Sequence, residues 1–508
     1  MESVSAMSEN NNPSSSKFST GKKSSKYEGP YQVDVSETGF DLETITLSYT
    51  GLLRIFRLLY VAEHCPALRS DALLASLHYL KETSATNIYK QVLEEIKKQN
   101  IELPADFDES WLERTQRGYV QKLEKLDTDL RNFRTNSIKD SIRRGNEDLG
   151  DHYLGAGDFH SAVRCYVSSR DYCVSPRHVI TMCMNVIKAS FFMQNWANVL
   201  SYVTKAEQAL ESLETTMKSP VTPSVTTSSS LPADLSEAEI ASRLKVYAGI
   251  AELATGRYKL AARHFLAVSF DHCANKFQDL ISPQTLIRYV CLCSLATLER
   301  AEVHRLIIMS SNMKQYLELE PSIRDIILDF YQTSYSSVLT NMSRQEPIFA
   351  LDQYLARHLP TLYDEIRHRI IITYFLPYKN ADMNAMAMKL NTTVNVLEDE
   401  LVHLIRLEKI KARIDSKNKI LYVADTDQRW HAYQHALSVT KRSEKITGAL
   451  LLRSAIMKAN LVVRDESAST AGRPPKMKGK SRGHLVPGYS SNMMMMMDDN
   501  EFYEDETM

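Results

Sequence analysis

The sequence predicts a mainly α-helical protein: a solenoid of tetratricopeptide-like helical repeats, then a winged helix with a small β-hairpin, then a C-terminal helix. Three observations predict this fold class. The 508 residues include only 16 glycines and 16 prolines, about half the usual share, which favours long helices over a β-sandwich or barrel. A short motif recurs near the middle of the chain. Later, helical periodicity gives way to two short alternating runs.

The composition is that of an ordinary globular protein, with 44% hydrophobic and 24% charged residues and a formal net charge of -1. A nearly neutral chain lacks the overall field that collects nucleic acid or anionic membrane. The seven cysteines are odd in number and include no C-x-x-C pair. No signal sequence opens the chain and no apolar run is long enough to span a membrane. These features predict a reduced, intracellular protein.

The N-terminal part contains a polar tail followed by helices. Residues 1–40 are rich in serine, asparagine and lysine without periodicity, so we expect them to be disordered. Residues 41–135 form a predicted N-terminal helical region. Its clearest element is a long amphipathic helix whose apolar stripe needs a partner helix. The stripe consists of Tyr119, Leu123, Leu126, Leu130 and Phe133.

Tetratricopeptide-like repeats are predicted over residues 136–345. Blocks 157–166 and 256–265 share the pattern G-x-[FY]-x-x-A-x-R-x-[FY]. A second glycine, Gly150 or Gly249, precedes each block by seven positions, where a small residue lets two helices approach closely. A weaker middle copy is marked by Trp196, Val199, Val203 and Ala206. A Ser/Thr/Pro-rich insert at 215–234 is predicted to be a flexible loop, and the next helix begins with a capping box of Ser236 and Glu239.

A winged helix is predicted over residues 346–425. Helices are expected at 362–376 and 383–390, and a third begins after the N-cap Thr393. The apolar face of the third helix carries Val394, Leu397, Leu401, Leu404 and Ile405. Alternating residues at 410–414, a polar turn and the run 420–423 then predict a two-stranded hairpin. A two-stranded wing leaves an open edge that another chain could extend.

A C-terminal helix is predicted over residues 426–462, with an apolar stripe suited to a helix bundle. The stripe comprises Trp430, Tyr433, Leu437, Leu450, Met457 and Leu461. The remaining residues, 463–508, are first basic, then methionine-rich and acidic, and are predicted to be a disordered tail.

The sequence predicts no catalytic residues, no cofactor site and no metal site. Phosphate-binding glycine loops and a serine-hydrolase elbow are absent. His431 and His435 have metal-ligand spacing, but Ala432 stands where a zincin needs its glutamate. Cys291 and Cys293 point in different directions on a helix, so buried structural thiols are expected.

Nucleic-acid binding is the alternative for a winged helix, and the third helix is poorly suited to it. Glu398, Asp399 and Glu400 would meet a polyanion with like charge, and we expect them on a solvated face. The wing offers Lys411, Arg413, Lys417 and Lys419. These cations suffice only for weak, non-specific contact with nucleic acid. The preferred interpretation is therefore a protein that joins other proteins into an assembly.

Helical repeats that run into a winged helix are the architecture of the PCI family, named for the proteasome lid, the signalosome and a translation initiation factor. Residues 387–423, AMKLNTTVNVLEDELVHLIRLEKIKARIDSKNKILYV, resemble a PCI winged helix throughout. Residues 137–173, SIKDSIRRGNEDLGDHYLGAGDFHSAVRCYVSSRDYC, are more specifically similar to a signalosome subunit. The likeness spans about 42–461, and a paralogous subunit of the proteasome lid is the close alternative.

This resemblance implies a non-catalytic scaffold of the complex that removes the ubiquitin-like Nedd modifier from cullin-RING ligases. Its implied partners are other PCI subunits and the metalloprotease pair of the signalosome, with cullin-RING ligases met through the complex, in cytoplasm and nucleus. No membrane partner is expected. The implied subunit contacts are Leu397, Leu401, Ile420, Leu421, Tyr422 and Val423 in the winged helix, and Trp430, Tyr433, Leu437, Leu450, Met457 and Leu461 in a helical bundle.

Overall fold

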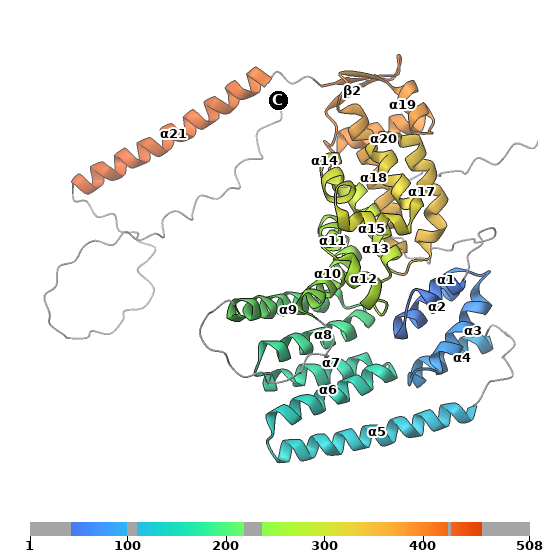
Figure 1. Cartoon of the computed structure of the whole chain (residues 1–508). Helices are drawn as coiled ribbons and strands as arrows, with labels where there is room; N and C mark the ends of the chain where they lie inside the picture. The colour runs from blue at the N-terminus through green and yellow to red at the C-terminus, as the bar shows by residue number, and fades with distance from the viewer. Residues whose placement is uncertain (1–41, 99–108, 218–235, 425–427, 460–508) are drawn as a thin grey trace, which may run out of the picture. The chain divides into compact units, whose positions relative to one another are not determined.

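A computed structural model shows a helical protein that ends in a small sheet and a long helix (Figure 1). It describes residues 42–98, 109–217, 236–424 and 428–459. The predicted tails at 1–40 and 463–508, and the insert from residue 218 onward, lie outside these ranges. The chain divides into two units, Met1–Ala424 and Asp425–Met508, each considered by itself. Among the helices within the described ranges, none is both long and apolar enough to cross a membrane.

The first unit begins with helices and continues through the repeats. Its N-terminal helices are α1 Leu42–Leu47, α2 Gly51–His64, α3 Arg69–Leu80, α4 Thr86–Lys98 and α5 Glu109–Thr135. The next are α6 Lys139–Ala156, α7 Phe159–Ser168, η1 Arg170–Tyr172, α8 Pro176–Phe192, α9 Trp196–Met217, α10 Glu237–Ala254 and α11 Tyr258–Leu266. Then follow α12 Phe270–Lys276, α13 Pro283–Thr297, α14 Arg300–Val303, the π-helix η2 His304–Ile308, α15 Ser311–Leu319, α16 Pro321–Tyr331 and α17 Tyr335–Ala350.

The winged helix and the last helix complete the fold. The elements are η3 Ala356–His358, α18 Leu359–Phe375, β1 Asn380–Asp382, α19 Met383–Lys389, α20 Val394–Arg406, β2 Ala412–Asp415, β3 Ile420–Val423 and α21 Gln428–Lys458. The mainly α-helical class, the order of repeats, winged helix and C-terminal helix, and the three predicted helices of the winged helix are confirmed.

The helix pairs of the repeats share one turn geometry. Gly157 and Gly256 have φ of 85° and 79°, and Gln194 at the equivalent position of the middle copy has 56°. In each turn this residue's amide donates to the carbonyl three residues back, and the next amide donates to the carbonyl five residues back. This is the Schellman motif, which satisfies carbonyls at a helix end and reverses the chain. The same pair of bonds recurs at Thr333, with φ 65°, between α16 and α17. The same pair of bonds also closes the turns at Ser137, Asn391 and Glu408, so this helix end does not by itself mark a repeat.

Close helix packing explains the upstream glycines. A Cβ added to Gly150 would lie 2.4 Å from the ring of Tyr166, and one added to Gly249 would lie 2.5 Å from the ring of Phe265. Both rings are fully buried. The equivalent positions of the middle copy hold Ile187 and Val203, both buried. In the two glycine-marked copies a large ring on one helix faces a glycine on the other, whereas in the middle copy two medium-sized side chains fill the equivalent space. Both combinations give the dense packing of a protein interior.

The remaining elements predicted along the repeats are also present. Leu130 of α5 packs with Ile142 and Leu149 of α6, and these three form a separate small core with Leu123, Leu126 and Phe133 of the predicted stripe around it. Tyr119, the first residue of the stripe, stacks on His152 of α6, with the ring centroids 4.4 Å apart. Helix α10 begins with the expected capping box: Glu239 donates its amide to the Ser236 hydroxyl, and the Ser236 amide donates to the Glu239 carboxylate. The start of the predicted insert, residues 215–217, is helical in α9.

A buried ion pair ties the N-terminal helices to the far end of the repeats. Arg57 of α2 lies 2.9 Å from the carboxylate of Asp352, which follows α17. The guanidinium also lies over the ring of Tyr49, 4.1 Å from its centroid, and Tyr289 of α13 donates its hydroxyl to Asp352. Removing one member of such a pair leaves a buried charge without compensation, so this contact holds α2 in a specific position.

The wing differs from the predicted two-stranded hairpin. β2 and β3 pair as expected, but β1, between α18 and α19, pairs with the other side of β3, giving the antiparallel order β1-β3-β2. The Val423 amide donates to the Lys379 carbonyl and the Met383 amide donates to the Lys419 carbonyl, which joins the two segments. The prediction of a two-stranded wing is therefore wrong: the strand 420–423 lies in the middle of a three-stranded sheet, and the outer edges belong to β1 and β2.

Candidate assembly surfaces

The sheet presents one polar and aromatic face away from the core. Leu421 of β3 points inward and is fully buried, whereas Tyr422 is 38% exposed. In the strand register, Tyr422 pairs with Asn380 of β1 and with Arg413 of β2. Since neighbouring residues directly across a sheet share a face, these three side chains form one exposed row. An aromatic ring flanked by an amide and a guanidinium is typical of a protein contact surface.

Three of the predicted contact residues belong to the interior instead. Leu397 and Leu401 of α20, and Leu421, have no exposed surface and are members of the main hydrophobic core. The apolar periodicity of these residues reflects their burial in the core of the winged helix itself. These three cannot touch a second chain in this fold, so that part of the predicted surface is wrong. Ile420, Tyr422 and Val423 are partly exposed and stay a prediction.

The carboxylates of α20 are engaged rather than simply solvated. Glu398 lies 2.6 Å from Lys419 of the wing, and this bond lowers the pKa of the Glu398 carboxyl. Glu400 lies 2.9 Å from Arg367 of α18, and burial raises the pKa of the Glu400 carboxyl. The expectation of a solvated acidic face is therefore wrong for these two. One wing cation is also already paired, which leaves less positive charge for a polyanion.

Thr393 has the extended N-cap backbone but makes no capping bond through its side chain.

Helix α21 carries its apolar residues on two opposite faces. At about 100° per residue, Trp430, Tyr433 and Leu437 lie within about 60° of one another, whereas Leu450 and Met457 lie about 180–200° away from Trp430. All five are exposed, Trp430 by 60%. The single stripe expected from the sequence is therefore wrong, because twenty residues of α-helix return to the opposite side. The last predicted member, Leu461, lies outside the described residues.

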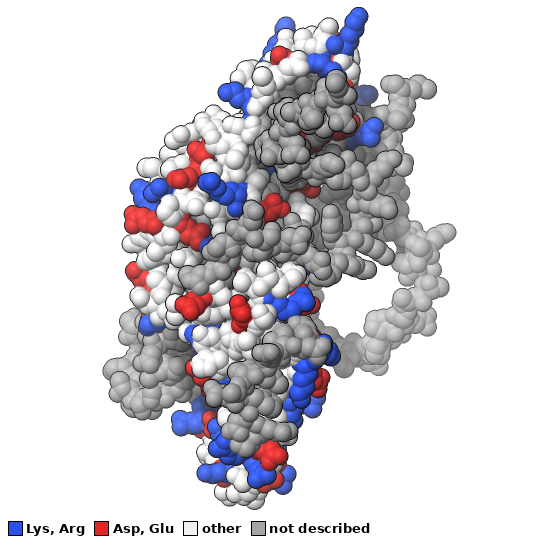
Figure 2. Space-filling view, turned by 90° about the vertical axis from the view of Figure 1, so that its right-hand side faces the viewer, with Lys and Arg blue, Asp and Glu red and all other residues white. Residues whose placement is uncertain are grey.

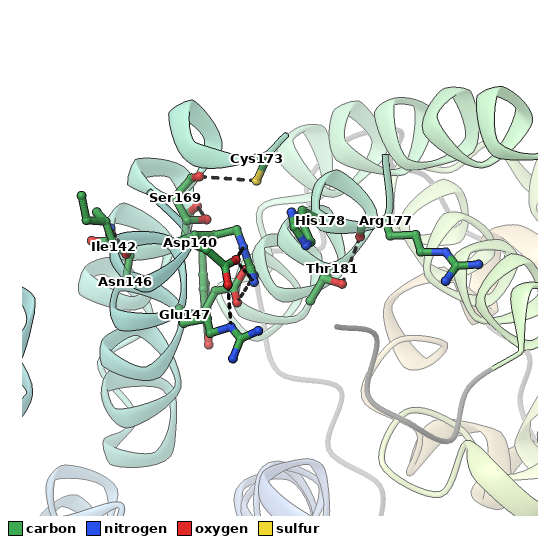
Figure 3. Close-up of polar contacts among 12 residues, drawn as sticks. Asp140, Ile142, Asn146, Glu147, Ser169, Cys173, Arg177, His178 and Thr181 are labelled. Carbon is green, nitrogen blue, oxygen red and sulfur yellow. Dashed lines mark hydrogen bonds and ion pairs between the residues drawn. The ribbon is translucent and has the colours of Figure 1, made fainter. Parts of the chain in front are cut away.

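A polar cluster lies at the start of α6 (Figure 3). Arg143 is 1% exposed; it donates to Glu147 at 2.6 Å and to Asp140 at 2.9 Å. The bond from Arg143 lowers the pKa of Asp140, whereas burial raises the pKa of Glu147. Burial also lowers the pKa of the nearby His178 on α8. Both carboxylates are bound by one guanidinium, which suits a brace within the repeats better than acid–base work.

The residues considered for metal binding do not converge. In the described part of the chain, no three His, Cys, Asp or Glu side chains are placed to hold an ion. Cys291 and Cys293 are fully buried in α13, and burial raises the pKa of the Cys293 thiol to about 12. Such thiols are inert structural groups. All seven cysteines are free.

Charge of both signs lies on one face of the described structure (Figure 2). On the face shown in Figure 2, Lys and Arg residues and Asp and Glu residues are interspersed over the coloured elements. A mixed surface of this kind favours neutral recognition surfaces over electrostatic capture of a polyanion.

Sequence reasoning missed β1 and therefore Asn380 as a neighbour of Tyr422. The signal for this strand is weak, because Asn380–Asp382 is three residues long and only Ala381 is apolar and buried. The Pro377 that ends the preceding helix pattern marks the place where such a segment could begin.

Comparison with known proteins gives matches over most of the chain. A family model described as 26S proteasome subunit RPN7 matches residues 108–306, and a PCI domain model matches residues 342–425. COP9 signalosome complex subunit 1b of Drosophila melanogaster is 38% identical, over 86% of this chain and 89% of its own. COP9 signalosome complex subunit 1 of Arabidopsis thaliana is 36% identical, over 84% and 91%. The 26S proteasome non-ATPase regulatory subunit 6 homolog of Arabidopsis thaliana is 21% identical, over 65% and 79%.

Proposed function

This chain belongs to the family of COP9 signalosome subunit 1, and we propose that it serves a signalosome as a non-catalytic scaffold. In this proposal the complex removes the Nedd modifier from cullin-RING ligases, and its metalloprotease is a different subunit. The direct partners are other PCI subunits, and the complex works in cytoplasm and nucleus. The observation that carries the proposal is the long similarity to signalosome subunit 1, at 38% and 36% identity, combined with two exposed surfaces suited to protein contacts.

The first contact is the exposed row on the sheet. Tyr422 supplies a large amphipathic ring, and its neighbours Asn380 and Arg413 supply hydrogen-bond donors. Burying an aromatic side chain in an interface stabilises it by roughly 1.5–3 kcal/mol. Because β3 is paired on both sides, a partner would meet the face of the sheet or extend β1 or β2 at its outer edges.

The second contact is α21. A helix with large apolar side chains on opposite faces needs neighbours on two sides to bury them. The face with Trp430 and Leu437 and the face with Leu450 and Met457 would therefore meet different helices. This arrangement supports a position inside a bundle of helices rather than a simple pairwise coiled coil.

The test is to capture the tagged full-length chain from cells and identify its partners by mass spectrometry. The proposal expects signalosome subunits in stoichiometric amounts. Proteasome lid subunits alone would favour the lid alternative, and nucleic acid without a stable protein complex would contradict both. Tyr422→Asp is expected to lower recovery of PCI partners while the helical circular dichroism stays unchanged. Val120→Asp, a similarly exposed position on α5, is the matched control.

A further inference from the structure

Helix α21 has a third surface besides its two apolar faces. Its sequence contains six lysines and arginines but a single acidic residue, Glu444. At about 100° per residue, four of these cations lie within a sector of about 120°, between the face of Trp430 and the face of Leu450. This cationic stripe consists of Lys441, Arg442, Lys445 and Arg453. His431 and His435 lie in the same sector.

The cations of the stripe have no anionic partner in the described part of the chain. All four are exposed, and none of them forms an ion pair there. Glu444 lies about 60° outside the stripe, towards the face of Trp430. Lys441 and Lys445 stand four residues apart, a spacing at which like charges repel each other and destabilise a helix. Carboxylates placed along the stripe would remove this repulsion.

Exposed apolar side chains accompany the cations. Leu452 is 64% exposed and lies within the stripe. Ile446 is 45% exposed and lies at the edge of the stripe, one turn from Arg442. Lysine and arginine are also attracted to the faces of aromatic rings. The stripe therefore suits an acidic ligand that also carries aromatic side chains.

One segment of this chain has the matching chemistry. Residues 498–506, DDNEFYEDE, contain six carboxylates, two aromatic residues and no lysine or arginine. An extended segment of this length spans about 26 Å. The stripe runs about 18 Å along α21 from Lys441 to Arg453. Carboxylates of the segment can therefore lie opposite all four cations at once.

The connection between α21 and this segment is long enough for the segment to return along the helix. Helix α21 is about 46 Å long, whereas residues 460–497 would span more than about 100 Å at full extension. Because both belong to one chain, the segment has a high effective concentration at the helix, which a separate acidic peptide or a nucleic acid must exceed. The chain's own acidic segment is therefore favoured as the occupant over a separate partner.

We propose that residues 498–506 bind along the cationic stripe of α21 in the same chain, with carboxylates against the four cations and an aromatic ring against Leu452. The bound segment keeps other polyanions away from the helix. It leaves both apolar faces of α21 uncovered, so this contact is separate from the assembly of a complex and does not depend on the proposed function.

The test is cross-linking of the full-length chain with a carbodiimide, which joins a carboxylate directly to a lysine amine, followed by mass spectrometry. We expect cross-links from residues 498–506 to Lys441 and Lys445 at about 50 mM salt, and at least about threefold fewer at about 1 M salt, which screens the charges. Arg442→Gln with Arg453→Gln keeps both lysines but removes half the charge of the stripe, so these cross-links should fall at least about threefold. The matched control, Arg429→Gln with Lys458→Gln on the opposite side of the helix, should leave them unchanged.

Several results would overturn the proposal. These are no cross-links from the segment to Lys441 or Lys445, equal cross-linking in the Arg442→Gln, Arg453→Gln variant, or cross-links only to the lysines of the basic run 473–482. In a mixture of unlabelled and nitrogen-15-labelled chains, cross-links mainly between differently labelled copies would make a second copy the occupant instead. Loss of the cross-links on adding an equal concentration of a single-stranded DNA of about 20 nucleotides would make nucleic acid the preferred ligand. All of these results are read on the free chain, so they are independent of the capture of signalosome subunits.

Discussion

The close approach between α10 and α11 gives the sharpest test of the repeat packing. In a Gly249→Ala variant the new methyl group would lie 2.5 Å from Cε1 and 2.7 Å from Cδ1 of Phe265, against about 3.4 Å for an ordinary contact. The ring would therefore have to move by about 1 Å. It has no free space for this movement, because Phe265 is fully buried and its ring centroid lies 5.6 Å from that of Tyr289.

The expected free energy has two opposing parts. Forcing a methyl group into a packed core costs roughly 1–3 kcal/mol. Replacing glycine by alanine inside a helix gains about 1 kcal/mol. Gly249→Ala should therefore lower the free energy of unfolding by up to about 2 kcal/mol. Gly118→Ala in α5, where a new Cβ meets no atom within 4 Å, should raise it by about 1 kcal/mol instead.

A double-mutant cycle isolates the clash from the helix propensity. In a Phe265→Leu background the ring is gone, so Gly249→Ala should gain the propensity and lose the clash. The coupling free energy between the two positions should then be about 1–3 kcal/mol. Urea denaturation followed by far-ultraviolet circular dichroism, with hydrogen exchange of α10 and α11 peptides, measures it. A coupling below about 0.5 kcal/mol would refute the packing argument, as would a gain of stability from Gly249→Ala equal to that from Gly118→Ala.

Three further predictions concern the interior. Arg57→Ala should lower the free energy of unfolding by about 3–5 kcal/mol, because the carboxylate of Asp352 is left buried and unpaired. The shift of the urea midpoint measures this loss, and a loss below about 1 kcal/mol would count against the buried ion pair. Burial lowers the pKa of His152, so the unfolded chain binds this proton first and stability should fall as the pH drops below about 6.5. His152→Gln should flatten that fall in urea titrations between about pH 7.5 and 5.5, and an unchanged slope would contradict the assignment. Burial raises the pKa of the Cys291 and Cys293 thiols, so iodoacetamide should modify neither cysteine until urea unfolds the chain. Mass spectrometry of the treated protein measures this, and modification in the native state would show that α13 is accessible.

Sequence patterns predicted the helical part of the fold well because its signals are local. Gly157 and Gly256 mark turns that require positive φ, and Gly150 and Gly249 mark places where a ring leaves no room for Cβ. The same kind of turn at Thr333, between α16 and α17, escaped this reasoning because a non-glycine residue has the positive φ there. Its backbone conformation is held by the hydrogen bonds of the helix end, which no residue type announces.

The candidate surfaces were predicted less completely, since a sequence pattern reports that a residue is apolar but not which surface buries it. Leu397, Leu401 and Leu421 followed the same periodicity as contact residues but are needed by the core of the winged helix. β1 was missed because its pairing partner is distant in the chain and its only buried residue is Ala381. The opposite faces of α21 follow from helix geometry alone and could have been derived from the spacing of Trp430 and Leu450.

The central claim is that this chain joins other subunits, in part through both faces of α21. The most direct measurement is co-elution of the full-length chain with the purified signalosome PCI subunits in size-exclusion chromatography. Trp430→Glu with Leu437→Glu changes one face, and Leu450→Glu with Met457→Glu changes the other. Each pair should remove the chain from the complex, whereas Ser438→Glu with Arg442→Glu, between the two faces, should not. Full incorporation of both apolar-face variants would contradict the account.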